Sequence, residues 1–166
     1  MENGRRYAEE TPLLEVRGIS KQYKGFLLDK VSFTLPKGYI MGYVGPNGAG
    51  KSTTLGIITQ TRRAAEGEVL LDGMTYADDP VLYKEKIGYV SSVSYFPPVM
   101  KIKDAAMLFR QFYPTFSGEK FFRLVREWEL PEKKKFSTFS TGMIVKLMFA
   151  AALARETRLL ILDEAT

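Results

Sequence analysis

Two short stretches of the sequence combine residue types that could handle phosphate and metal chemistry. The first is GPNGAGKS, Gly45 to Ser52, which fits the pattern G-x-x-x-x-G-K-[ST]. Glycines let the backbone curl so that successive N–H groups point at an anion, and the dipole of a following helix adds to the attraction. Lys51 can neutralise the β- and γ-phosphates of a nucleotide, and the Ser52 hydroxyl can ligate Mg²⁺. The stretch predicts a phosphate-binding loop; the alternative is a glycine-rich turn without a ligand.

The second stretch is LLILDEAT, Leu159 to Thr166, in which four large apolar residues precede two carboxylates. Such a run is typical of a strand buried on both faces of a parallel sheet, whose carboxyl ends carry the chemistry. Asp163 could hold Mg²⁺ through water, and Glu164 could orient and deprotonate the water that attacks a γ-phosphate. Because acidic pairs often follow apolar strands, this prediction depends on the phosphate loop in the same chain.

The segments around these stretches predict an α/β fold with a phosphate-loop core. LLEVRGIS and LLDKVSFTLP have alternating apolar positions and are expected to form an antiparallel edge layer. The segment GYIMGYVG is predicted to be a buried strand, KSTTLGIITQ a helix, and GEVLLDG and KIGYVSS two further strands of a mostly parallel sheet. Residues 1–11 are expected to be a mobile tail, and residues 12–166 one domain.

From about Lys101 the pattern becomes helical, which predicts an inserted helical subdomain over about residues 101–155. Asp104 could cap a helix that continues through Tyr113. A second helix has an apolar face, and a third is expected from Thr141 to about Arg155. The second helix's face is formed by Phe121, Leu124, Val125 and Trp128. Core packing, rather than cofactor stacking, is the expected role of the subdomain's aromatic residues, Phe109, Phe112, Phe121, Phe122 and Trp128.

The composition restricts the possible chemistry. The 166-residue chain contains no Cys and no His, which excludes disulfides, Cys/His metal sites and catalysis by an imidazole or a thiol within it. Its formal net charge of +5 comes from scattered basic residues, and the dense run Lys133 to Lys135 is expected in a solvated loop. We therefore expect no nucleic-acid partner. The longest apolar stretches fall short of the roughly 20 residues that a membrane span needs.

A third stretch, FSTGM (Phe139 to Met143), precedes the third predicted helix. Together with GPNGAGKST and LLILDEAT it resembles the ATP-binding cassette (ABC) ATPase family, whose signature motif opens a helix just upstream of the acidic strand. The resemblance runs from about Leu13 to Thr166. The stretches IGYVSSVSYFPPV and FYPTF, with the S-x-G-M form of the signature, resemble the bacterial exporter-type branch.

The resemblance implies that ATP and Mg²⁺ bind and that ATP is hydrolysed to ADP and phosphate to drive export. It implies a head-to-tail dimer with a second ATPase subunit, bound to separate transmembrane permease subunits on the cytoplasmic face of the cell membrane. Tyr23 matches the aromatic residue that stacks on adenine, with a plain surface tyrosine as the alternative. Ser140 and Gly142 match signature residues that contact the opposite subunit's γ-phosphate, and Ser140 could also be a helix N-cap. The phosphate-loop matches are Gly45, Asn47, Gly48, Gly50, Lys51, Ser52 and Thr53, with Lys51 and Glu164 catalytic and Ser52 and Asp163 on the metal.

Several positions depart from the family pattern. Ser92 stands where a Gln usually contacts Mg²⁺ or the attacking water, Thr141 replaces a signature glycine, and Ala165 replaces a frequent Pro. The family's γ-phosphate-sensing His is missing, so we expect a cassette truncated just after the acidic strand, with apolar surface exposed beside it. Two alternatives stay open. One is a module that binds nucleotide without turnover, and the other is a soluble ABC protein of translation or DNA repair.

Overall fold

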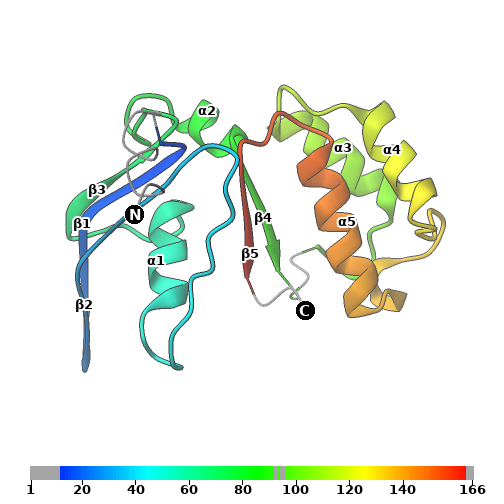
Figure 1. Cartoon of the computed structure of the whole chain (residues 1–166). Coiled ribbons are helices and arrows are strands. Elements are labelled where there is room, and N and C mark those ends of the chain that lie inside the picture. The colour runs from blue at the N-terminus through cyan, green and yellow to red at the C-terminus, as the bar shows by residue number, and fades with distance from the viewer. Residues whose placement is uncertain (1–11, 92, 94–95, 164–166) are drawn as a thin grey trace, which may run out of the picture. The chain divides into compact units, whose positions relative to one another are not determined.

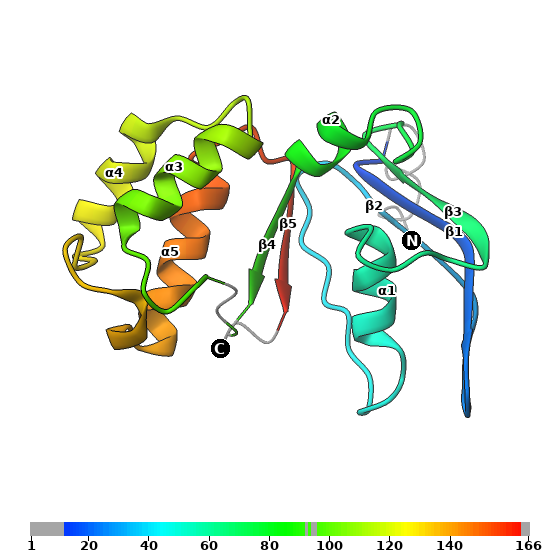
Figure 2. The same ribbon diagram turned by 180° about the vertical axis from the view of Figure 1, so that it is seen from behind.

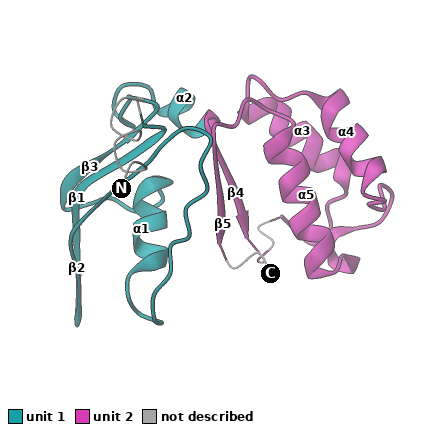
Figure 3. Ribbon diagram, viewed as in Figure 1, with its two compact units in different colours: residues 1–84 teal, residues 85–166 magenta. Residues whose placement is uncertain are grey.

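The computed structural model describes residues 12–91, 93 and 96–163, which belong to two compact units (Figures 1 and 3). The first unit covers residues 1–84 and the second covers residues 85–166. Within the described parts of both units, no helix is long and apolar enough to cross a membrane.

The first unit contains a three-stranded antiparallel sheet in the order β2-β1-β3. Its strands are β1 (Leu14–Tyr23), β2 (Phe26–Leu35) and β3 (Glu66–Leu71). The antiparallel pairing of the first two strands confirms the expected edge layer. The placement of β3 differs from expectation, because it pairs antiparallel with β1 rather than joining a parallel sheet. Its pattern could not show this, since periodicity reports which face of a strand is buried and not which strand lies beside it.

Two helices accompany this sheet, α1 (Lys51–Ile58) and α2 (Pro80–Glu85). Helix α1 begins at the last residues of the phosphate-loop stretch, as its helical spacing predicts. It has an apolar buried side at Ile57 and Ile58, and Tyr83 from α2 donates a hydrogen bond to the Ile58 carbonyl over 3.0 Å. The short helix α2 was not predicted from the sequence.

The prediction of a buried strand at GYIMGYVG is wrong for the described structure. Residues 39–46 form no strand, Ile40 is fully exposed and Val44 is 91% exposed. A buried strand needs neighbours that satisfy its backbone N–H and C=O groups, and no described strand pairs with this segment. Tyr43 anchors it instead: its ring lies 5.6 Å from that of Phe33, and its hydroxyl lies 3.2 Å from the Thr54 hydroxyl.

The second unit contains two parallel strands, β4 (Ile87–Ser91) and β5 (Leu159–Asp163), which run side by side in both views (Figures 1 and 2). The helix α5 (Thr141–Leu153) packs closely on β4 at Gly88, where an added Cβ would lie 2.9 Å from the Ala152 Cβ. The prediction that strand β5 is buried on both faces is wrong. Leu159 and Ile161 are buried, but Leu160 and Leu162 are 37% and 54% exposed, which confirms the expected apolar surface beside the acidic strand.

The helical part of the second unit has its own apolar core. It is formed by α3 (Ile102–Phe112), α4 (Gly118–Glu127), the short 3₁₀ helix η2 (Phe136–Thr138) and α5. Phe121 and Val125 are fully buried, which confirms the predicted face of the second helix. The prediction that Phe112 packs in this core is wrong, because Phe112 lies at the end of α3 and is 69% exposed.

The start of α3 and the basic turn before η2 agree with expectation in most respects. Asp104 does cap α3, but from the third helical position, where its carboxylate accepts a hydrogen bond from the Lys101 N–H over 2.8 Å. The basic residues 133–135 are exposed and lie between α4 and η2, as expected. The predicted α/β class is confirmed, while the expected tail over residues 1–11 lies outside the described residues.

Candidate functional site

The phosphate-loop stretch forms a curled turn in front of α1. Gly48 and Gly50 have φ values of 83° and 94°, in the left-handed region that favours glycine. The Lys51 side chain folds back across the turn, and its Nζ donates hydrogen bonds to the carbonyls of Gly45 at 2.6 Å and Pro46 at 2.9 Å. An ammonium group is thus held at the place where the sequence predicts a bound phosphate.

The side of this loop packs against β2. A Cβ added to Gly50 would lie 2.8 Å from the Leu28 Cδ1 and 2.9 Å from the Phe26 Cζ, so the backbone passes directly over these side chains. Ser52 is exposed, whereas Thr53 is buried. The close approach explains why this position takes a glycine.

Tyr23 lies near the same loop through Phe26. The two rings are stacked with centroids 6.4 Å apart, and Phe26 lies against Gly50. The Tyr23 side chain is 38% exposed. The Arg62 guanidinium donates a hydrogen bond to its hydroxyl over 3.0 Å, and Lys21 lies 5.8 Å from the ring centroid. The first unit therefore brings together the predicted adenine-stacking residue and the phosphate loop.

Asp163 is the last residue of β5 and lies in the second unit. Its partner in the parallel register is Ser91, the last residue of β4. The Tyr89 hydroxyl donates a hydrogen bond to the Asp163 Oδ2 over 2.5 Å, and both side chains are partly buried. Asp163 thus lies at a strand end, as its sequence motif predicts, whereas nothing in the spacing of the motifs points to Tyr89.

The signature residues begin α5. The Ser140 hydroxyl accepts a hydrogen bond from the Met143 N–H over 3.2 Å, which confirms the predicted N-cap. Gly142 lies in the first turn and is exposed, with the Ser140 Oγ 4.0 Å from the position of an added Cβ. Thr141, the departure from the family pattern, is exposed as well. The exposed first turn leaves this end of the helix accessible.

A buried polar cluster in the second unit was not foreseen. The carboxylate of Glu85 accepts hydrogen bonds from the backbone N–H and the hydroxyl of Thr115. Arg155 donates to the carbonyls of Glu85 at 3.2 Å and Ile87 at 2.5 Å, and its guanidinium lies 3.9 Å from the Tyr113 ring centroid. Burial lowers the pKa of Arg155, while Tyr113 and Glu85 act in the opposite direction. The cluster joins the end of α5 to the start of β4.

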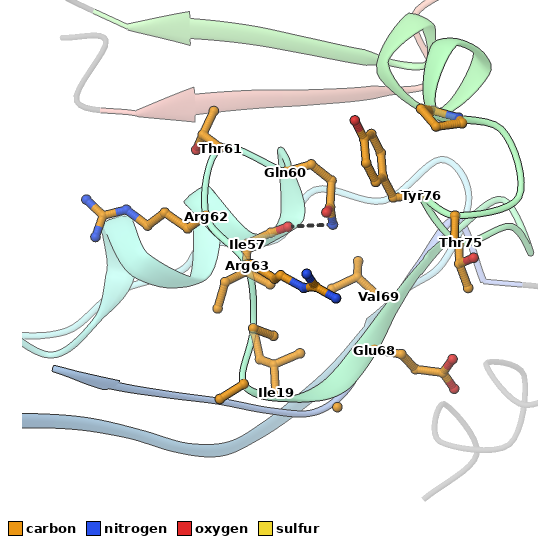
Figure 4. A pocket seen from close by; sticks show the side chains of 15 residues that line it. Ile19, Ile57, Gln60, Thr61, Arg62, Arg63, Glu68, Val69, Thr75 and Tyr76 are labelled. Atoms are coloured by element: carbon orange, nitrogen blue, oxygen red, sulfur yellow. Dashed lines mark hydrogen bonds between the residues drawn. The ribbon is translucent and has the colours of Figure 1, made fainter.

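The first unit also has an open hollow of about 820 Å³, shown in Figure 4. Its described lining includes no phosphate-loop residue and joins the end of α1, strand β3 and the chain before α2. Gln60 is fixed there by a hydrogen bond of 2.9 Å to the Ile57 carbonyl. Arg62 lines the hollow and also bonds the Tyr23 hydroxyl, so the hollow shares a residue with the surroundings of Tyr23 but none with the phosphate loop.

The predicted site residues are divided between the two units. The first unit holds Tyr23 and the phosphate loop, and the second holds Asp163, Ser140 and Gly142. Glu164, the predicted base, lies outside the described residues, as do Ser92 and Ala165.

Comparisons with known proteins agree with the motifs. A family model described as "ABC transporter" matches residues 28–166. The ABC transporter ATP-binding protein YtrB of Bacillus subtilis is 34% identical over 155 residues, covering 93% of this chain and 53% of the relative. The spermidine/putrescine import ATP-binding protein PotA of Spiroplasma citri is 34% identical over 161 residues, covering 93% of this chain and 46% of the relative.

A comparison of the fold with solved structures agrees with the sequence comparisons. A solved structure described as the ATP binding subunit of an ABC transporter matches with a TM-score of 0.81 and 29% identity, over 92% of this chain and 66% of the other. The chain spans about half the length of the curated relatives it matches. With a family model over most of its length, and with relatives and a solved structure in agreement, the chain belongs to the ABC transporter family.

Proposed function

We propose that this chain binds ATP through its phosphate loop and, as part of a complete ATP-binding subunit, hydrolyses it to ADP and phosphate. The observation that carries the proposal is the Lys51 ammonium held over the loop by the carbonyls of Gly45 and Pro46. A phosphate oxygen is charged and forms stronger hydrogen bonds with an ammonium than neutral carbonyls do. An incoming nucleotide can therefore take over Lys51 without a rearrangement of the backbone.

Each remaining loop residue has a proposed task. The backbone N–H groups of the turn would cradle the phosphates, and the start of α1 would add its dipole. Tyr23 would stack on the adenine. The Arg62 guanidinium carbon lies 5.9 Å and the Lys21 Nζ 5.8 Å from the centroid of its ring, so one of them would have to move aside. The residues that would contact the nucleotide are Tyr23, Gly45, Asn47, Gly48, Gly50, Lys51, Ser52 and Thr53.

Mg²⁺ would accompany the nucleotide. The Ser52 hydroxyl and the Asp163 carboxylate offer the oxygen ligands that Mg²⁺ prefers, and Mg²⁺ commonly uses one or two protein ligands together with substrate phosphates. Among the described residues there is no group of three or more acidic, His or Cys side chains that could hold an ion unaided. The bound ion would neutralise charge on the β- and γ-phosphates.

Binding is tested on the chain itself with a fluorescent ATP analogue. Replacement of Lys51 by Ala should weaken binding by about 100-fold, since it removes a charge-assisted bond to the phosphates. Lys134→Ala is the matched control, because Lys134 is an exposed lysine in the basic turn of the second unit. Equal affinity of the Lys51→Ala and Lys134→Ala variants would contradict the proposal.

Hydrolysis is proposed to depend on Glu164 as the general base. In the complete subunit, Glu164→Gln should keep ATP bound and trap a closed dimer, because the attacking water is no longer deprotonated. Undiminished steady-state phosphate release in that variant would contradict the assignment. ATP binding by the 166-residue chain without phosphate release would instead identify it as a nucleotide-binding module.

The partners are proposed from the family. Ser140 and Gly142, in the exposed first turn of α5, would contact the γ-phosphate bound by a second ATPase subunit in a head-to-tail dimer. Separate permease subunits would hold the dimer at the cytoplasmic face of the membrane. Export is the proposed direction, from the branch that the motifs resemble; the relatives' names include both peptide export and spermidine/putrescine import.

A further inference from the structure

Tyr89 makes a short side-chain contact with Asp163, one of the predicted site residues in the second unit. Its phenolic O–H donates a hydrogen bond to the Asp163 Oδ2 over 2.5 Å. Such a distance is at the short end for an O–H donor and an oxygen acceptor, where bonds to ionised carboxylates are found. The contact joins residues 74 positions apart in the sequence.

The strand pairing explains how the two groups meet. Tyr89 is paired with Ile161 in the parallel register, and Asp163 is paired with Ser91, so the tyrosine lies two residues before the level of the carboxylate. Side chains two residues apart lie on the same face of a sheet, and a tyrosine is long enough to reach along it. The phenol therefore reaches Asp163 along the face of the sheet, from two residues back along the strands.

A carboxylate at the end of a strand can otherwise rotate about its last side-chain bond, whose energy profile is broad. A hydrogen bond to one oxygen limits that rotation and leaves the second oxygen, Oδ1, for a metal or its water. Partners that orient metal-binding carboxylates in this way typically affect metal affinity by 10–100-fold.

We propose that Tyr89 is a positioning residue for Asp163, fixing the orientation in which this carboxylate receives the nucleotide's Mg²⁺. The proposal rests on the proposed function, because it takes Asp163 as the metal-binding carboxylate. A purely structural role would only tie β4 to β5. That task is already met by the backbone ladder and by the buried side chains of Val90, Leu159 and Ile161.

The test compares metal-dependent and metal-free ATP affinity, with Mn²⁺ as the probe for the divalent ion. In the intact chain, the dissociation constant of the fluorescent ATP analogue is measured in excess EDTA and in excess Mn²⁺. Tyr89→Phe should leave the EDTA value unchanged and reduce the Mn²⁺-induced tightening by about 10-fold. Tyr76→Phe is the matched control, since it removes a phenolic hydroxyl from the first unit, outside the predicted site.

A double-mutant cycle separates positioning from a structural role. Asp163→Asn alone should abolish most of the Mn²⁺ effect, and adding Tyr89→Phe should then cause no further loss, because the two residues act through one bond. Circular dichroism checks that each variant is folded. Full retention of the Mn²⁺ effect in Tyr89→Phe, or a parallel change of both dissociation constants, would overturn the inference and leave the proposed function standing. Absence of ATP binding by the unmodified chain would overturn both.

Discussion

At Gly50 two independent restrictions act on one residue. The backbone has a φ of 94°, and an added Cβ would lie 2.8 Å from Leu28 and 2.9 Å from Phe26. Gly48 shares only the first restriction, with a φ of 83° and nothing within 4 Å. Gly42 has neither. The three glycines thus separate the cost of an unfavourable backbone from the cost of crowding.

Alanine at each of these positions should give an ordered series of stabilities. We expect almost no change in the free energy of unfolding for Gly42→Ala and a loss of about 1 kcal/mol for Gly48→Ala from the left-handed backbone. For Gly50→Ala we expect a loss of about 2–3 kcal/mol, because the crowding is added. Urea denaturation of the three variants measures the series. Equal losses at Gly48 and Gly50 would show that Leu28 and Phe26 move aside freely.

At the scale of elements, two helices of the second unit begin with the same capping contact. The Ser117 hydroxyl accepts a hydrogen bond from the Lys120 N–H at the start of α4, and the Ser140 hydroxyl accepts one from the Met143 N–H at the start of α5. Both distances are 3.2 Å. Only Ser140 belongs to the signature, so the pair distinguishes a structural role from a functional one.

Ser117→Ala and Ser140→Ala should each lower stability by about 1 kcal/mol, the usual cost of losing an N-cap. Only Ser140→Ala should weaken ATP-induced dimerisation of the complete subunit, because its hydroxyl is proposed to reach the partner's nucleotide. Thermal unfolding measures the first effect and sedimentation velocity with ATP measures the second. If both variants dimerise equally well, Ser140 is a cap and nothing more.

The elements also show which parts of the structure could be predicted. Helices α1, α4 and α5 were foreseen because a helix satisfies its own backbone and its apolar spacing lies within one segment. The strand expected at GYIMGYVG failed because a strand takes its hydrogen bonds from elsewhere in the chain. The same reason explains why β3 was assigned to the wrong kind of sheet.

The site was foreseen where a motif is continuous. The phosphate loop, Asp163 and the Ser140 cap each lie in one short stretch whose residue types state their chemistry. Tyr89 and the cluster around Arg155 were missed because each depends on residues about 70 positions apart, joined only by the folded chain. A tyrosine in a strand has the same pattern whether or not a carboxylate lies within its reach.

At the scale of the whole molecule, the titratable side chains should make stability depend on pH at alkaline pH but not near neutral pH. With no His and no Cys, no side chain has an ordinary pKa between about 5 and 8. Desolvation in the first unit raises the pKa of Tyr83 from 10.0 to about 12, with a hydrogen bond from Gln60 acting in the opposite direction. The folded chain therefore holds this proton more tightly than the unfolded chain does.

Stability should be nearly constant from about pH 6 to 9 and should fall as the pH rises from 10 towards 12. Above pH 10 the unfolded tyrosine loses its proton while the folded one keeps it, which favours unfolding by at most about 2–3 kcal/mol. Urea denaturation across this range measures the fall. Tyr83→Phe should make the fall smaller, and Tyr39→Phe, at an exposed tyrosine, should leave it intact. A steep change near neutral pH would contradict this account.

The Lys51 bridge across the phosphate loop has a consequence for rates as well as for affinity. When a nucleotide arrives, the Lys51 ammonium is already hydrogen-bonded to the carbonyls of Gly45 and Pro46. Association then needs two events, the release of the Lys51 ammonium from these carbonyls and the arrival of the phosphate. If release is the slower event, the observed association rate levels off at high ATP concentration. The plateau would then report how often the Lys51 side chain leaves the two carbonyls by itself.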